Sequence, residues 1–151
     1  PVCSREATIL ITEIVDLDVD SYQVPRYIEL YAPRKRHRGT AFNHDLKLVI
    51  FHSDSVEPHW ASAVPIDYMP ESGFLVICNR AAHAAYGTEC AETSLVIGGP
   101  ADSNGNDQIA LISGDEDSWF VVDIYGVIGE DGYGESEVFD HIYLETEKFI
   151  S

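Results

Sequence analysis

Short apolar runs, separated by Gly, Pro, Asn, Asp and Ser, follow one another along most of the chain. Val, Ile, Leu, Phe and Tyr dominate these runs, as is typical of β-strands bounded by turns. The pattern predicts strands over Ala7–Asp16, Arg26–Pro33, Asp45–His52, Gly73–Cys78, Thr93–Gly98, Asp107–Ser113, Trp119–Val127 and Val138–Ile150.

One segment has a helical pattern. Arg80–Tyr86 is rich in Ala and is followed by Gly87, a residue that commonly ends helices. Strands and helices do not alternate, and neither a fixed-period repeat nor a low-complexity linker occurs. We therefore expect a single all-β domain over residues 1–151, mostly antiparallel, built as a sandwich or barrel with one short helix.

Three carboxylates interrupt the apolar runs. Strict alternation of side chains places each one on a face with apolar or aromatic neighbours. A buried carboxylate is costly unless it is paired or hydrogen-bonded. Each therefore accepts hydrogen bonds from backbone N–H groups or tyrosine hydroxyls, or the carboxylates together hold a cation. The carboxylates and their expected same-face neighbours are Glu13 with Ile9, Ile11 and Val15; Glu29 with Tyr27 and Tyr31; and Asp123 with Val121 and Tyr125.

The charge balance is strongly acidic. The 151 residues carry 26 Asp and Glu against nine Lys and Arg, a formal net charge of −17. Such a chain repels nucleic acid and attracts cations or basic partners. No apolar run is long enough to span a bilayer. The hydrophobic fraction of 45% fits one globular domain with a core of its own.

Four of the nine basic residues are concentrated in one short segment: Arg34, Lys35, Arg36 and Arg38. We call residues 34–38 the basic loop. A solvated loop is the simplest interpretation, and a docking site for an acidic ligand is the functional one. A nuclear localisation signal or a nucleic-acid patch is less favoured, because the other charges are negative and no aromatic residue interleaves with the basic ones.

A second segment is dense in oxygen donors, which are the ligands that calcium prefers. It is not an EF-hand, because Asp107 and Ser113 stand where that loop needs Gly and Glu. The alternative is a turn in which Asx side chains bind their own backbone and no ion is needed. The candidate calcium ligands of this loop are Asp102, Asn104, Asn106 and Asp107.

The common catalytic motifs do not occur. The chain lacks G-x-S-x-G, the P-loop, G-x-G-x-x-G and H-E-x-x-H. Four histidines, His37, His44, His52 and His59, lie in four different places, which favours single histidines over a zinc site. We therefore expect a protein that is not an enzyme.

The cysteines and the first residue leave alternatives open. Cys78 and Cys90 flank a short segment, whereas Cys3 stands apart. A Cys78–Cys90 disulfide is the natural pairing in a secreted protein, and three reduced thiols are the cytosolic alternative. The chain starts at Pro1 and its only Met is Met69, so a leader was removed or this is a piece of a larger protein.

Most of the chain resembles the lamin tail domain family, specifically its secreted branch in bacteria and marine microbes. The specific signals are GGPADSNGNDQIAL and DIYGVIGEDG, whereas ITEI or IELY alone would be weak. The matching pieces are Leu10–Ile14, Tyr27–Tyr31, Gly73–Cys78, Ala81–Gly87, Gly98–Leu111 and Val122–Gly132.

This resemblance implies an immunoglobulin-like β-sandwich that has no catalytic centre and serves as an accessory module in larger proteins. It favours the Cys78–Cys90 disulfide and an extracellular or cell-surface location. Protein, polysaccharide or matrix ligands are the expected partners, and nucleic acid is not. The acidic positions that recur in the family correspond to Glu13, Glu29, Asp107 and Asp123. These add to the candidate calcium ligands.

The chain departs from the family pattern at RKRHR and at EVFDHIYLETEKF, where a family member with a partner of its own is expected to differ, and the fold expectation is unchanged. Two alternatives to a binding module remain. One is a metal-dependent hydrolase, or an accessory domain of one, built on Glu13, Glu29, Asp107 and Asp123. The other is a nuclear scaffold domain that uses the basic loop.

Overall fold

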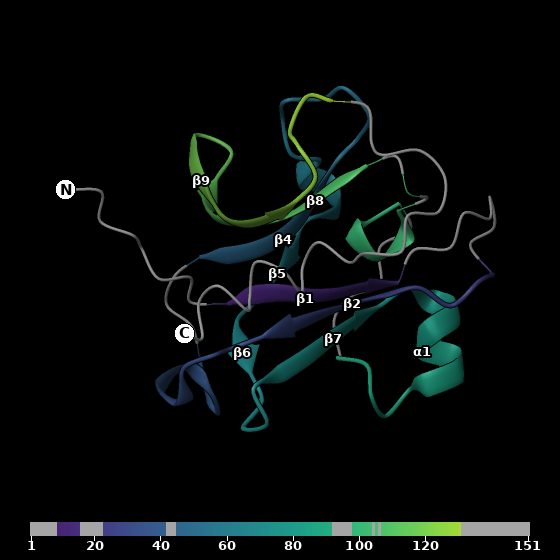
Figure 1. The fold of residues 1–151 in the computed structure, drawn as a ribbon, viewed down its shortest axis with the longest axis vertical. Helices are drawn as coiled ribbons and strands as arrows, with labels where there is room; N and C mark the ends of the chain where they lie inside the picture. The colour runs from purple at the N-terminus through teal and green to yellow at the C-terminus, as the bar shows by residue number, and fades with distance from the viewer. Residues whose placement is uncertain are drawn as a thin grey trace, which may run out of the picture.

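A computed structural model describes residues 9–15, 23–41, 45–91, 98–103, 105 and 107–130 (Figure 1). Strands dominate these residues, and every strand pairing among them is antiparallel. The strands are β1 Leu10–Val15, β2 Tyr27–Tyr31, β3 Thr40–Ala41, β4 Leu46–Phe51, β5 Val64–Pro65, β6 Tyr68–Met69, β7 Phe74–Cys78, β8 Gln108–Asp115 and β9 Ser118–Tyr125. The helices are α1 Arg80–Tyr86 and the 3-10 turns η1 Lys35–His37, η2 Trp60–Ser62 and η3 Pro100–Asp102.

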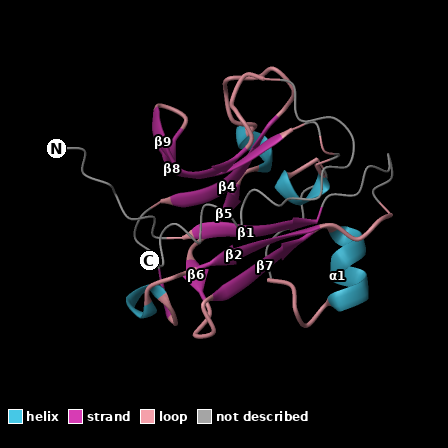
Figure 2. Ribbon diagram, viewed as in Figure 1, coloured by secondary structure: helices cyan, strands magenta, loops and turns pink. Residues whose placement is uncertain are grey.

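Two larger sheets form the layers of a sandwich. One sheet has the strand order β1-β2-β7, the other has the order β5-β4-β8-β9, and a small third sheet pairs β3 with β6. The two larger sheets lie one above the other, and α1 lies beside the end of the β1-β2-β7 sheet (Figures 1 and 2). The structure thus confirms the predicted all-β, antiparallel sandwich with one short helix.

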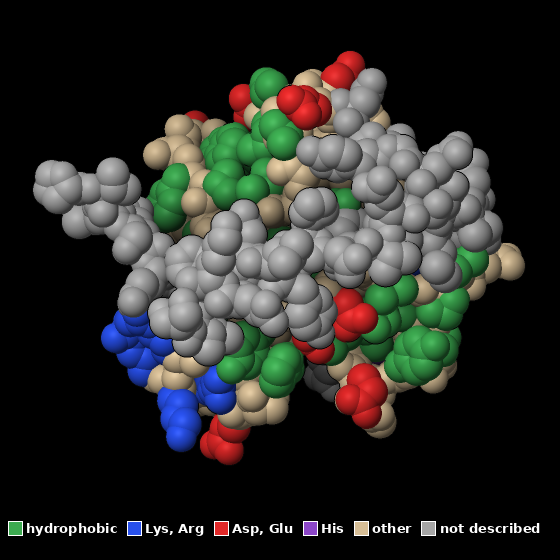
Figure 3. All heavy atoms as spheres, in the orientation of Figure 1, with side chains coloured by type: hydrophobic (Ala, Val, Ile, Leu, Met, Phe, Trp, Pro, Cys, Tyr) green, Lys and Arg blue, Asp and Glu red, His purple; other side chains and the backbone are tan. Residues whose placement is uncertain are grey.

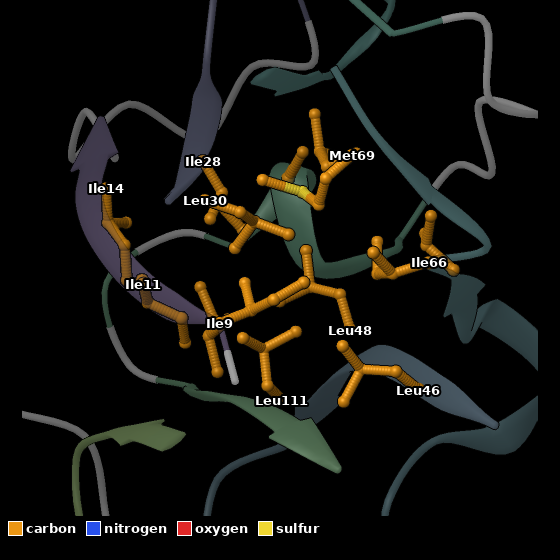
Figure 4. Close-up of a cluster of buried hydrophobic side chains, with 14 of the residues drawn as sticks. Ile9, Ile11, Ile14, Ile28, Leu30, Leu46, Leu48, Ile66, Met69 and Leu111 are labelled. Carbon is orange, nitrogen blue, oxygen red and sulfur yellow. The ribbon is translucent and has the colours of Figure 1, made fainter. Parts of the chain in front are cut away.

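The main core lies between the two sheets. Its side chains come from both layers and point toward one another (Figure 4). Leu30, Leu48 and Leu111 are fully buried at its centre. Burial of apolar side chains is the main favourable term that holds such layers together. The buried members of the core are Ile9, Ile11, Ile14, Ile28, Leu30, Ala32, Leu46, Leu48, Val64, Ile66, Met69, Ile77, Ala101, Ile109 and Leu111.

The outer face of the β5-β4-β8-β9 sheet carries a second apolar cluster. Val49, Phe51, Ala110 and Ile112 are its buried members. Trp60 and Trp119 pack against it half-buried, and the Trp119 ring lies 5.8 Å from that of Phe51. Strands that are buried on both faces read as continuous apolar runs, which explains the patterns LKLVIF and QIALIS.

Two β-bulges correct the face assignments made from alternation. In the β1–β2 pairing Ile11 faces Leu30 and Glu13 faces Glu29, so Thr12 is an extra residue. A bulge shifts the inside–outside alternation by one position. Ile14 consequently joins Ile11 in the core, whereas Glu13 is exposed. The expectation that Glu13 lies among apolar neighbours was therefore wrong.

The second bulge acts on β9 in the same way. Asp123 faces Leu111 and Val121 faces Ile112 in the β8–β9 pairing, which leaves Val122 as the extra residue. Paired residues of neighbouring strands point to the same side of a sheet. Asp123 therefore lies on the inner side with Leu111, whereas Val121 lies on the opposite side. The prediction that Asp123 shares a face with Val121 was therefore also wrong.

The helix forms over the predicted residues. Asn79 caps its N-terminus, and the Asn79 side-chain oxygen accepts the Ala82 N–H at 2.9 Å. That oxygen also accepts the Arg26 N–H at 3.1 Å, while the Asn79 amide donates to the Val24 carbonyl at 2.9 Å. The buried Asn79 thus joins the helix to the segment before β2.

Cys78 and Cys90 lie at disulfide distance on either side of α1, with their Cα atoms 5.7 Å apart. Ala82, half-buried Tyr27 and Val76 pack with this pair in a third apolar cluster. The favoured cysteine pairing is thus confirmed as geometry.

The two-residue strands β3, β5 and β6 are too short to produce a sequence pattern. The predicted strands Thr93–Gly98 and Val138–Ile150 fall outside the described residues, apart from Gly98. Within the described part of the chain, no helix is long and apolar enough to cross a membrane.

Candidate functional site

The basic loop is held in one conformation by its own backbone. It leaves β2 at Tyr31 and turns through η1, where His37 N–H donates to the Arg34 carbonyl at 3.0 Å. Arg38 N–H donates to the Lys35 carbonyl at 3.1 Å. Beyond the loop, Gly39 N–H donates to the Met69 carbonyl at 2.8 Å, and β3 pairs with β6. The loop is thus anchored at both ends by sheet hydrogen bonds.

The side chain of Arg38 folds back onto the sheet instead of pointing to solvent. Its Nε donates to the Ala32 carbonyl at 2.9 Å, and its guanidinium donates to the Tyr31 hydroxyl at 2.8 Å. The guanidinium also lies 5.2 Å from the centre of the Tyr31 ring, within cation–π range. Gly73 leaves room for it, because a Cβ there would lie 2.5 Å from the Arg38 Nε. Arg38 therefore fastens the loop to β2 and β7.

Two cations of the loop are presented to solvent. Lys35 and Arg36 are exposed, whereas Arg34 and Arg38 are half-buried. The Arg36 Nε lies 3.1 Å from the His37 Nε2. Lys and Arg side chains gather at the corner of the molecule where η1 lies, while Asp and Glu are scattered over the rest of the visible face (Figures 1 and 3). The four predicted binding residues therefore divide into two exposed cations and two that are more enclosed.

Two exposed aromatic side chains come from strands that hold the loop. Tyr68 on β6, which pairs with β3, has 49% of its surface exposed. Phe74 on β7 has 47% of its surface exposed, and its ring centre lies 4.7 Å from that of Tyr31. The Tyr31 ring is the one that the Arg38 guanidinium covers. Neither residue was predicted from the sequence. An unbroken apolar run such as GFLVIC does not reveal that Phe74 faces outward, and the two-residue strand β6 leaves no pattern around Tyr68.

The three carboxylates predicted from the strands each have a hydrogen-bond donor. The Glu13 carboxylate accepts the Tyr27 hydroxyl at 3.2 Å, and Glu29 accepts the Thr12 hydroxyl at 2.8 Å. Asp123 accepts backbone N–H groups on β1 and β9. Glu13 and Asp123 thus have the expected kinds of donor, a tyrosine hydroxyl and backbone N–H groups, whereas the donor to Glu29 is a threonine hydroxyl.

Glu13 and Glu29 do lie together, as cross-strand partners on the outer side of β1 and β2. Tyr27 lies beside them on the same side. Burial raises the pKa of the Tyr27 hydroxyl above 10.0, and the negative charge of Glu13 raises it further. A negative field therefore covers this part of the β1-β2-β7 sheet.

The predicted calcium loop is only partly described. The Asp102 carboxylate accepts the Gly98 N–H at 3.1 Å, and the Asp102 carbonyl accepts the Arg26 guanidinium at 3.1 Å. The Asp107 carboxylate lies 3.4 Å from a ring nitrogen of His52. Asn104 and Asn106 lie outside the described residues. Among the residues that are described, no three Asp, Glu, His or Cys side chains form a group that could hold a metal ion.

The predicted acidic residues therefore occupy separate places. Glu13 and Glu29 lie on the outer side of one sheet, Asp123 lies at the inner edge of the other, and Asp102 and Asp107 flank the loop before β8. No protein-family model, curated protein or solved structure matches the chain. A function for this chain is therefore argued from the geometry and the chemistry of its described residues.

Proposed function

We propose that this domain is a non-catalytic interaction module that binds an acidic ligand through the basic loop. The observation that carries this proposal is the exposure of Lys35 and Arg36 on a loop whose backbone and neighbouring Arg38 are fixed by hydrogen bonds. A loop that is already ordered loses little conformational entropy when it binds, which favours affinity.

The negative charge of the rest of the protein directs an acidic ligand toward the basic loop. With a net charge of −17, the protein as a whole repels an acidic ligand, whereas the exposed cations of the basic loop attract it. Complementary charges increase association rates and exclude wrong orientations more than they increase affinity. Tyr68 on β6 and Phe74 on β7 add exposed apolar surface on the strands that hold the loop. Aromatic residues at the centre of an interface often contribute much of its binding energy.

An extracellular location is part of the proposal. It is supported by the disulfide distance between Cys78 and Cys90, because disulfides persist in oxidising compartments. It is also supported by the resemblance of the segments Gly98–Leu111 and Val122–Gly132 to secreted lamin tail domains. Acidic matrix polysaccharides and acidic protein segments are the ligand classes that fit such a location.

The test measures binding of two acidic probes, heparin as a sulfated polysaccharide and poly-L-glutamate as an acidic polypeptide. Isothermal titration calorimetry at about 50 and 150 mM salt measures how much of the affinity is electrostatic, because salt screens the attraction between exposed charges. We expect Arg36→Glu to weaken binding of the preferred probe roughly tenfold, and the wild-type affinity to fall as salt rises.

Arg80→Glu is the matched control, since Arg80 is exposed on α1 and the change in net charge is identical. It should leave the affinity within about twofold. Equal losses in the two variants would show that only net charge matters. Failure of the wild-type protein to bind either probe would also contradict the proposal.

A calcium ion in the loop 102–107 is a second, separable part of the proposal. Asp102 and Asp107 would supply carboxylate oxygens and Asn104 and Asn106 amide oxygens, which is the ligand chemistry that calcium prefers. A ligand that binds only the folded state raises the melting temperature. We expect a higher melting temperature in calcium than in EDTA, and loss of that difference in Asp107→Ala. Identical melting temperatures would remove calcium from the proposal.

A further inference from the structure

The fold brings together two histidines that the sequence places in separate segments. His52 follows β4, and His59 precedes η2. Their ring centres lie 4.8 Å apart with the planes inclined at 54°. Both residues are exposed. The pair does not involve the basic loop, and it shares only Asp107, the neighbour of His52, with the proposed calcium loop.

Backbone hydrogen bonds explain why the two rings meet. After β4 the chain turns at once, with Ser55 N–H donating to the His52 carbonyl at 2.8 Å. It then returns to the same strand, where His59 N–H donates to the Ile50 carbonyl at 2.8 Å. The two ends of the loop 52–59 are therefore held side by side at the end of β4.

Strand register supplies an acidic neighbour. Phe51 on β4 pairs with Gln108 on β8, so the next residues along the two antiparallel strands are His52 and Asp107. The His52 Nδ1 lies 3.4 Å from the Asp107 Oδ1. An ionised carboxylate only accepts hydrogen bonds, so the Asp107 position favours a proton on Nδ1 of His52. The Nε2 of that ring then carries the free lone pair.

His59 has a hydrogen-bond partner of its own that is compatible with the same protonation state. Its Nδ1 lies 2.7 Å from the hydroxyl oxygen of Ser62, a buried residue. The Ser62 hydroxyl also lies 3.3 Å from the His59 carbonyl oxygen, to which it can donate. When it donates there, it accepts from the ring, and the proton then lies on Nδ1 and the lone pair on Nε2.

We propose that His52 and His59 bind one divalent transition-metal ion, with zinc as the reference ion, through their Nε2 atoms. Metal-binding histidines are commonly fixed by a hydrogen bond from the other ring nitrogen to a carboxylate or another acceptor, and Asp107 and Ser62 occupy these positions. Imidazole suits zinc, copper and nickel better than calcium or magnesium. No third such side chain among the described residues completes the site, so water fills the remaining coordination positions.

The bound ion would join the two ends of the loop 52–59. Asp107 would act on the metal only through His52, as a positioning residue. The same holds for Ser62 and His59. The site would therefore bind a metal ion and order the loop. Its ligand is a divalent transition-metal ion that is coordinated by imidazole nitrogen.

The test follows zinc binding by side-chain ¹⁵N NMR and titration calorimetry. It uses a Cys3→Ser background, because cysteine can also bind zinc, and excess magnesium, which occupies carboxylates in preference to imidazoles. We expect Nδ1 protonation of both rings without metal and a shift of both Nε2 signals on addition of zinc.

His52→Gln and His59→Gln should each lower the zinc affinity at least about tenfold, and Asp107→Asn should lower it by a smaller factor. His83→Gln is the matched control, because His83 is exposed on α1, and it should leave the affinity within about twofold. The ¹⁵N–¹H spectrum of each variant reports whether it is folded. An unchanged zinc affinity in a folded His52→Gln/His59→Gln double variant, or Nε2 signals that do not move in the wild type, would overturn the proposal.

Discussion

The carboxylate of Asp123 on β9 accepts the backbone N–H of Ile11 on β1 at a distance of 2.7 Å. β1 and β9 are edge strands of different sheets and do not pair with each other. This side-chain hydrogen bond therefore joins the two layers of the sandwich. Both strands carry a bulge beside it, at Thr12 and at Val122. The bond satisfies an N–H group of an edge strand, which otherwise is a template for pairing with another chain.

Removal of this carboxylate is expected to destabilise the fold. Asp123→Ala leaves the N–H of buried Ile11 without this acceptor, and the loss of a hydrogen bond to a charged partner costs about 1.5–3 kcal/mol. The free energy of unfolding from urea titration measures the effect. Glu116→Ala is the control, because Glu116 is exposed in the turn between β8 and β9 and the charge change is the same. Equal losses in the two variants would contradict a specific role for Asp123.

Replacement of Gly73 should damage the attachment of the basic loop. Gly73 and Gly98 both have positive φ, +85° and +74°, so Gly→Ala strains the backbone at either site, at a cost of about 1 kcal/mol. A Cβ at Gly73 also meets the Arg38 guanidinium, whereas a Cβ at Gly98 meets nothing within 4 Å. We expect Gly73→Ala to lose more stability in urea than Gly98→Ala and to shift the Arg38 side-chain NMR signals. Matching losses without such a shift would show that Arg38 is not held there.

The pair Cys78 and Cys90 should contribute strongly to stability. A disulfide that closes a loop of this size lowers the entropy of the unfolded chain and is worth about 3 kcal/mol. The Cys78→Ser/Cys90→Ser variant should show such a loss in urea under non-reducing conditions, and α1 should lose helical signal. Wild type in reductant should match the variant. Intact-mass detection of free thiols at both positions in oxidised protein would contradict the pairing.

Tyr27 should make stability depend on alkaline pH. Because its pKa in the folded protein is raised above 10.0 by burial and by Glu13, the native state keeps a proton that the unfolded chain releases. The contribution is fully present below about pH 10 and is lost as the pH rises through the folded-state pKa. Urea midpoints at about pH 9 and pH 11 should fall more for wild type than for Tyr27→Phe.

Tyr68→Phe is the control for this experiment, since Tyr68 is half-exposed on β6. Its urea midpoints should follow those of wild type across the same pH range. If Tyr27→Phe loses as much stability as wild type between the two pH values, the raised pKa of Tyr27 is not the cause of the alkaline loss of stability.

The local features of this protein could be predicted from its sequence. The positions of the long strands follow from apolar runs, and α1 occupies Arg80–Tyr86 as the Ala-rich segment before Gly87 predicts. The concentration of cations in residues 34–38 and the spacing of Cys78 and Cys90 are also visible in the chain. These features depend on residues close together in sequence, where propensity and composition act directly.

Tertiary structure decided the rest, because it depends on which residues of distant segments face each other. The bulges at Thr12 and Val122 reverse the faces of Glu13 and Val121, and alternation alone does not show an extra residue. The register of β4 and β8 places His52 beside Asp107, and the return of the loop adds His59. Such pairings arise only when sheet register and loop path are set by packing of the core, which no single segment determines.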